Sequence, residues 1–195
     1  MSKSTDTAPL SRVAQIAAFT TVGTLGITQD ITHALLRDIG DMEGADPELV
    51  AEETLCLVAT ATARAAQVGL KAEPERASVA HDTLLNLPYT YRDYLIGSAM
   101  VAEQDKALAE MSEAIYERLQ RKMQFYTTHL PADQFPGPHA LKDKMALWMG
   151  RVSPPKLPES PQERLEKLEL VDMLLTHVKL VLAFGRRGNE GSSQG

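Results

Sequence analysis

Apolar residues recur every three or four positions along most of the chain, which is the spacing of one face of an α-helix. Alternating runs of β-branched residues, the pattern of half-buried strands, are missing from the sequence. Leu10–Thr24 carries one helical stripe, and Gly23 and Gly26 are expected to end or bend this helix. Thr28 then begins a second predicted helix, which runs to Ile39.

Capping residues mark the clearest helix boundaries. Asp46-Pro47-Glu48 combines a capping carboxylate, a proline at the first helical position and an acid in the first turn, so it starts a predicted helix that ends near Val68. This helix is rich in alanine, which lets neighbouring helices approach closely, and we expect it to be central and buried. Ser160-Pro161-Gln162-Glu163 is a capping box, which starts a last predicted helix that reaches Phe184.

Three further helices are predicted between these two. Pro74–Leu87 is a shorter helix that Pro88 is expected to interrupt, and Tyr89–His129 is predicted as one long helix or two collinear ones. His139–Met149 follows a proline-rich loop and is predicted as a short amphipathic helix. Val152–Pro161 holds four prolines and is predicted to be an extended spacer.

These elements predict an all-α protein. Residues 1–130 are expected to form a helical bundle of about five helices, and residues 131–187 a C-terminal helical arm on a proline-rich hinge. Residues 188–195 are expected to be a disordered tail. The arm either folds back on its own bundle or crosses to a second copy, and a proline-stiffened hinge favours such exchange. We therefore expect a homo-oligomer, a dimer in the simplest case.

Charge argues against a nucleic acid partner. The chain of 195 residues has a net charge of −6, and its first eighty residues hold eleven acidic and six basic side chains. An acidic chain repels phosphate backbones. Val22–Asp38 has the outline of a helix-turn-helix, but its second helix carries Asp30 and Asp38 against Arg37 alone, which does not suit a phosphate-lined groove.

Membrane insertion and secretion are also disfavoured. The longest uncharged run, Val13–Gln29, is too short and too polar to span a bilayer, and its threonines interrupt the apolar stretch that a signal peptide needs. The single cysteine, Cys56, cannot form an internal disulfide, which fits a cytoplasmic protein. Its apolar neighbours Leu55 and Leu57 are expected to raise the thiol pKa and leave the thiol inert.

No standard catalytic constellation can be assembled from the sequence. It lacks a G-x-S-x-G nucleophile turn, a phosphate-cradling glycine loop, a paired C-x-x-C and an H-E-x-x-H helix. We therefore favour a non-catalytic protein over an enzyme, and no cofactor is expected.

An acidic run surrounds the start of the alanine-rich helix and could chelate a hard cation. It comprises Asp38, Asp41, Glu43, Asp46, Glu48, Glu52 and Glu53. The run fails as a calcium loop, because placing Gly44 at the required glycine puts Ile39 and Val50 at ligand positions. A solvated loop and helix start explains it. Asp30 and His33 lie one turn apart, as in di-metal bundles, but the second pair that such bundles need is missing.

His81-Asp82, placed on a predicted helix, resembles the tandem pair of the HD-type metal-dependent phosphohydrolases, whose fold is also all-α. The resemblance covers these two residues. It implies a metal site in which His33 joins His81 and Asp82, with Asp143 or Asp172 as the last ligand, and a metal-activated water that attacks a phosphoester. The sequence has no basic cluster beside the pair to hold a phosphate.

An aromatic cluster after Pro88 is a candidate ligand site. Tyr89, Tyr91 and Tyr94 gather around Arg92, and the Arg92 guanidinium offers a fork to an anion. The alternative is a cluster that packs at a helix end.

A second candidate is the apolar face of the predicted helix His139–Met149. Leu141, Met145, Trp148 and Met149 share this face, as expected for an anchor that docks into a groove. The groove is either that of a partner or that of its own bundle.

Three functions remain open on the sequence. The first is a non-catalytic helical interaction or regulatory protein that self-associates through its arm. The second is an HD-like phosphohydrolase centred on His81-Asp82. The third is a small-ligand sensor that holds an apolar or anionic molecule in the bundle near the tyrosines.

Overall fold

The chain is all-helical, as predicted. A computed structural model describes residues 11–39, 41–70, 72–103, 106–130, 138–155 and 157–186. Within these ranges it contains seven helices and no strand. They are α1 (Arg12–Ile39), α2 (Pro47–Gly69), α3 (Pro74–Glu103), α4 (Lys106–His129), α5 (Pro138–Val152), α6 (Pro161–Lys167) and α7 (Leu170–Arg186). The predicted tail over residues 188–195 lies outside the described residues.

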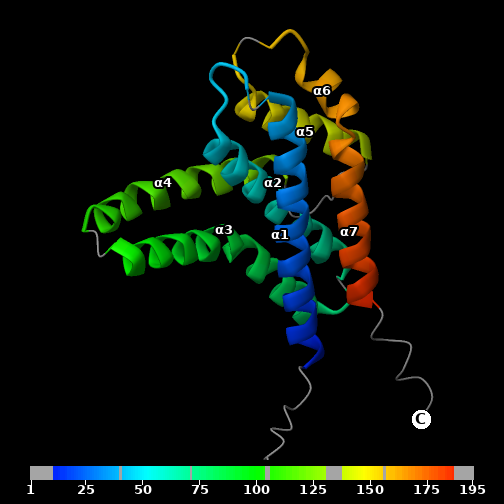
Figure 1. Cartoon of the computed structure of the whole chain (residues 1–195). Helices are drawn as coiled ribbons and strands as arrows, with labels where there is room; N and C mark the ends of the chain where they lie inside the picture. The colour runs from blue at the N-terminus through cyan, green and yellow to red at the C-terminus, as the bar shows by residue number, and fades with distance from the viewer. Residues whose placement is uncertain are drawn as a thin grey trace, which may run out of the picture.

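Helix α2 lies at the centre of the bundle, and α1, α3, α4, α5 and α7 all pack against it (Figure 1). It begins as predicted, because the Asp46 carboxylate accepts a hydrogen bond from the Leu49 amide at 3.0 Å and Pro47 takes the first position. All of its alanines except Ala51 are buried and keep the surrounding helices close. At its end, a Cβ on Gly69 would overlap the Leu182 side chain of α7, so a larger residue at this position would force that side chain to move.

Helix α1 is continuous over 28 residues, so the prediction that one helix ends at Gly23 and Gly26 and a second begins at Thr28 is wrong. Helix α7 runs antiparallel beside it (Figure 1). A Cβ on Gly23 would lie only 3.1 Å from His177 Cε1, so the glycine brings the two helices together. Packing against α7 thus outweighs a propensity cost of about 1 kcal/mol per helical glycine. The helix-turn-helix outline is also lost, because α1 has no turn in it.

Helices α3 and α4 form an antiparallel hairpin, whose outer half projects from the bundle (Figure 1). The two helices run in opposite directions, so the prediction of one long helix or two collinear helices over Tyr89–His129 is wrong. Pro88 does not separate two helices and lies inside α3.

Pro88 marks the point where α3 leaves the bundle. Ala80 and Leu84 before it are buried, whereas Tyr91 and Tyr94 after it are exposed. Proline lacks the amide that would bond to the carbonyl four residues earlier, so α3 lacks one helical hydrogen bond at this point.

The C-terminal helices fold back onto the same bundle. Helix α5 packs on α2, and α7 packs on both α1 and α2. The apolar face of α5 belongs to the chain's own core, since its four predicted anchor side chains are fully buried there: Leu141, Met145, Trp148 and Met149.

The predicted last helix is in fact two helices. The capping box between Ser160 and Glu163 is present and starts α6, which ends after two turns. Glu169 between α6 and α7 has a φ of 52°, in the left-handed region. This turn allows Leu165 of α6 and Leu170 of α7 to reach the same buried cluster. In one straight helix, these two side chains would not both face it.

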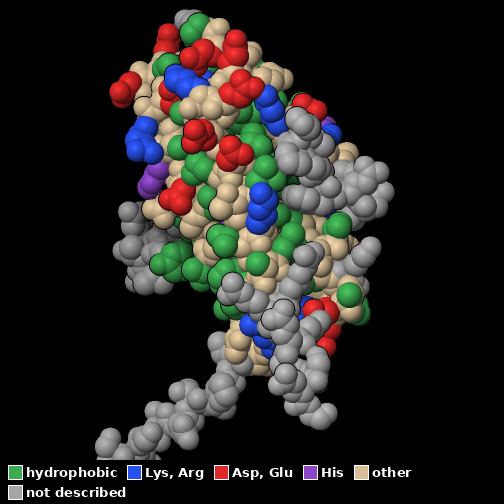
Figure 2. Space-filling view, turned by 90° about the vertical axis from the view of Figure 1, so that its right-hand side faces the viewer, with side chains coloured by type: hydrophobic (Ala, Val, Ile, Leu, Met, Phe, Trp, Pro, Cys, Tyr) green, Lys and Arg blue, Asp and Glu red, His purple; other side chains and the backbone are tan. Residues whose placement is uncertain are grey.

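A buried arginine fastens α6 to the end of α1. Arg164 pairs with Asp38 of α1 and, at 2.9 Å, with Glu159. Lys167 reaches Asp38 at 2.9 Å as well. Asp38, predicted to belong to a solvated acidic run, is therefore an anchor. Figure 2 views the molecule from the α7 side, where acidic side chains gather toward the end that α6 occupies.

His177 is buried where α7 packs on α1. Its Nε2 atom lies 3.4 Å from Thr24 Oγ1, within hydrogen-bond distance. Burial lowers the pKa of His177 to about 4. The folded protein therefore holds this imidazole neutral, although the unfolded chain takes up a proton at about pH 6.5.

Stability should fall as the pH drops below about 6.5, because only the unfolded state then protonates His177, and the fall should level off near the folded pKa. Between pH 7 and pH 5 we expect His177 to remove about 2 kcal/mol from the free energy of unfolding. Urea titrations of the natural protein and of His177→Gln at both pH values measure this. An equal loss of stability in the two proteins would show that His177 is not responsible.

Candidate functional site

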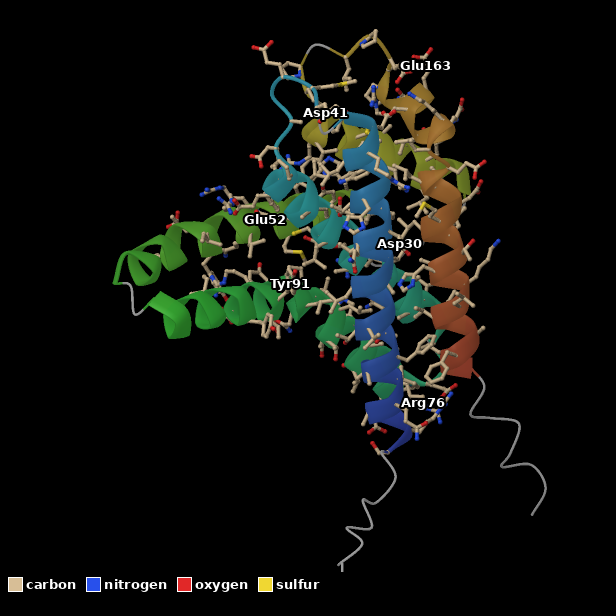
Figure 3. All side chains as sticks on the ribbon, in the orientation of Figure 1. Asp30, Asp41, Glu52, Arg76, Tyr91 and Glu163 are labelled. Atoms are coloured by element: carbon tan, nitrogen blue, oxygen red, sulfur yellow. The ribbon has the colours of Figure 1, made fainter. Side chains whose placement is uncertain are left out.

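A cleft of about 690 Å³ opens in the angle between α1 and the α3–α4 hairpin, with α2 as its floor. Its lining is mainly apolar. Leu55 of α2 and Leu119 of α4 line the cleft on the inner side, and Pro88 and Tyr91 of α3 line it on the hairpin side. In Figure 3, Tyr91 is labelled on α3 and Glu52 on α2, the two elements that meet α1 around this cleft.

The α1 side of the cleft follows from helical spacing. Val22, Gly26, Gln29 and Thr32 recur every three or four residues, so they share one face of the continuous helix. Val22 is 70% exposed, which is unusual for a valine. A Cβ on Gly26 would meet nothing within 4 Å, so the glycine leaves space at the cleft.

The acidic groups at the cleft are paired. Glu52 accepts hydrogen bonds from Arg118 at 2.6 Å and from Lys122 at 2.7 Å, and Arg118 also reaches Glu48 at 3.0 Å. Burial alone would raise the pKa of Glu52, but the hydrogen bonds from the two cations outweigh it and lower this pKa. These contacts also hold α4 to α2.

The cationic group at the cleft is engaged too. Arg92 donates to Asp93 Oδ1 at 3.1 Å, and its guanidinium carbon lies 4.4 Å from the centre of the Tyr116 ring. Tyr116 in turn packs against Tyr89, with ring centres 5.1 Å apart. The Arg92 guanidinium, which the sequence suggested as an anion-binding group, therefore contacts Asp93 and Tyr116 of the hairpin itself.

Thr32 differs from the other buried threonines of the described chain. Its hydroxyl oxygen is buried and has no hydrogen-bond partner there. The other six all have one; Thr28, for example, donates to the carbonyl of Thr24 at 2.7 Å. A buried polar atom without a partner costs about 1–3 kcal/mol. Thr32 lines the cleft, although its hydroxyl oxygen itself has almost no accessible surface there.

A buried carboxylate lies deeper in the bundle. Glu53 is 1% exposed and receives Arg151 of α5 through two hydrogen bonds, at 2.6 and 2.9 Å, and the Tyr126 hydroxyl of α4 at 2.6 Å. Burial, followed by the Glu53 charge, raises the pKa of Tyr126, and burial raises the pKa of Cys56. The interpretation of Glu53 as part of a solvated run is wrong: it joins three helices.

Removing Arg151 alone should lower the free energy of unfolding more than removing both Arg151 and Glu53. Arg151→Met leaves a buried carboxylate without its main cation, and we expect it to lower the free energy of unfolding by about 3 kcal/mol. The double variant Glu53→Met/Arg151→Met should recover most of that loss. Chemical denaturation measures both; a double variant less stable than Arg151→Met would contradict this explanation.

The residues implied by the HD-type resemblance do not form a metal centre. Arg64 donates to His81 Nε2 at 2.9 Å, because a guanidinium can only donate. The His81 proton is therefore on Nδ1, which donates to Asp82 at 3.0 Å. His33 lines the cleft. Among the described residues, no three His, Cys, Asp or Glu side chains are grouped so that they could hold a metal ion.

The predicted tyrosine cluster is divided by the structure. Tyr91 and Arg92 line the cleft, whereas Tyr89 packs against the core and Tyr94 is 69% exposed on the hairpin. Sequence reasoning missed Thr32, along with Val22 and Gly26. The spacing of the three residues would have revealed their shared face if the helix had been taken as continuous.

Comparisons of this chain with protein-family models, with curated proteins and with solved structures give no match. In the part of the chain that the structure describes, no helix combines the length and the apolar character that crossing a membrane requires.

Proposed function

We propose that this protein is a non-catalytic sensor that binds a small apolar molecule in the cleft between α1 and the α3–α4 hairpin. The observation that carries the proposal is the cleft itself, with a volume of about 690 Å³ and a mainly apolar lining. Pockets for small ligands in proteins measure roughly 300–1,000 Å³ and have such linings. The single buried Cys56 supports a reducing compartment, the cytoplasm, for this function.

The hairpin supplies a way to report binding. A molecule in the cleft touches α1 on one side and Pro88 and Tyr91 of the hairpin on the other. Beyond Pro88, the hairpin exposes Tyr91 and Tyr94, while Ala80, Leu84 and Leu87 before it are buried. A ligand that contacts both sides therefore favours one hairpin position over others.

Two glycines allow a matched test of the cleft. Gly26 and Gly150 both lie within helices, and a Cβ at either would meet nothing within 4 Å, but only Gly26 lines the cleft. Gly26→Leu should weaken binding of the uncharged apolar dye Nile red by about tenfold or more, because its side chain occupies the cleft. Gly150→Leu should leave binding unchanged.

Fluorescence titration of Nile red measures both variants, and thermal unfolding confirms that they fold. Both substitutions should raise stability slightly, because leucine has a higher helix propensity than glycine. Equal Nile red affinity in the two variants, or no binding to the natural protein, would overturn the proposed function.

A further inference from the structure

Helix α3 has an apolar side that continues past the point where the helix leaves the bundle. Leu84, Leu87, Tyr91 and Tyr94 follow one another at spacings of three, four and three residues, so they share one side of the helix. Leu84 and Leu87 are buried, whereas Tyr91 is 42% and Tyr94 69% exposed. The side of α3 that the bundle covers before Pro88 is therefore exposed beyond it.

Helix α4 runs beside this part of α3 and covers its opposite side (Figure 1). Tyr89 packs on Tyr116 of α4 with ring centres 5.1 Å apart, and the Arg92 guanidinium carbon lies 4.4 Å from the centre of the same ring. Tyr91 and Tyr94 each follow one of these residues by two positions, which is about 200° around the helix. We call the exposed side that holds Tyr91 and Tyr94 the outer face of α3.

The sequence of this part of α3 is typical of a helix that is covered on more than one side. Residues 94–102 include no charged residue and are mainly apolar, and a helix that is apolar all round is normally buried. In the sequence, Ser98 and Val101 continue the spacing of three and four residues. This repeat is the pattern by which one helix packs along another, so the outer face fits a partner helix.

We propose that this partner helix is α3 of a second copy of the chain, which lies antiparallel on the outer face. In an antiparallel pair centred at Ile96, Tyr94 of one copy is opposite Ser98 of the other, and Tyr91 is opposite Val101. Each large residue thus meets a smaller one, as close packing requires. A parallel pair in register would instead set tyrosine against tyrosine and serine against serine. Twofold symmetry lets both copies cover their outer faces at once.

Charge argues against a lipid surface as the occupant. Residues 103–117, which follow the outer face into α4, hold five acidic residues and one basic residue. Anionic headgroups would repel this segment, and helices that lie on membranes are typically rich in Lys and Arg. In the antiparallel pair, α4 of each copy lies on the side of α3 away from the interface, so the two acidic segments stay apart.

Sedimentation over a concentration series tests the proposal. The natural protein should form a dimer of twice the chain mass of 21.3 kDa. Tyr94→Glu places a charge in the interface and should raise the dissociation constant about tenfold or more. Leu180→Glu is the matched control, since Leu180 is also an exposed apolar residue, 57% accessible, but lies on α7. It should leave the dissociation constant unchanged, and thermal unfolding checks that both variants fold.

Cysteine substitutions test the antiparallel arrangement. Thr90 and Gly97 are both exposed on α3 and lie seven residues apart, so they share one side of the helix. Gly97 is beside the centre of the antiparallel pair, and Gly97→Cys should give a disulfide-linked dimer on mild oxidation. Thr90→Cys should not, because this packing sets its two copies about 20 Å apart. The natural Cys56 is buried and should not react.

A natural protein that stays monomeric up to about 1 mM would overturn the proposal, whether or not it binds lipid vesicles. Equal dissociation by Leu180→Glu and Tyr94→Glu would overturn the choice of face, and cross-linking of Thr90→Cys as readily as Gly97→Cys would overturn the antiparallel arrangement. A dimer that Gly26→Leu dissociates and Tyr94→Glu does not would place the second copy in the cleft. Tyr94 does not line the cleft, so Tyr94→Glu should still bind Nile red, which separates this proposal from the proposed function.

Discussion

The adjacent carboxylates Glu52 and Glu53 hold the outer helices in place on α2. Glu53 points into the core and fixes α4 and α5 through Tyr126 and Arg151, while Glu52 holds α4 through Arg118 and Lys122. Buried charges are stable only when paired, so this arrangement fixes where α4 meets the bundle. The angle between the hairpin and α1, and hence the cleft, depends on it.

The bundle and the hairpin contribute differently to the cleft. On the bundle side, α2 is buried among its neighbours and Leu55 offers an apolar floor. On the hairpin side, Pro88 removes one helical hydrogen bond where α3 leaves the core, and Tyr91 beyond it is exposed. While Glu52 and Glu53 fix α4, the exposed side chains of α3 beyond Pro88 leave fewer buried contacts to resist a change there, which is the change that the proposed sensor would use.

The all-helical fold could be predicted from the sequence. The capped helix starts could be predicted as well, because Asp46 and Ser160 act through local hydrogen bonds. The positions where helices end could not be predicted, because tertiary packing decides them. Gly23 stays helical against His177, and Glu169 adopts a left-handed turn so that both flanking helices reach the core. The same limit applies to the site. Tyr91 was within reach of sequence reasoning, whereas the unpaired hydroxyl of Thr32 depends on neighbours that only the fold brings together.

Hydrogen exchange with and without Nile red tests most directly whether the proposed ligand binds in the cleft between the bundle and the hairpin. Amides of residues 54–66 in α2 should exchange most slowly in both states, since they open only with global unfolding. Nile red should slow exchange over residues 22–33 of α1 and 88–92 of α3, which border the cleft. Slower exchange confined to α5, α6 and α7, with none at α1 and α3, would contradict this assignment.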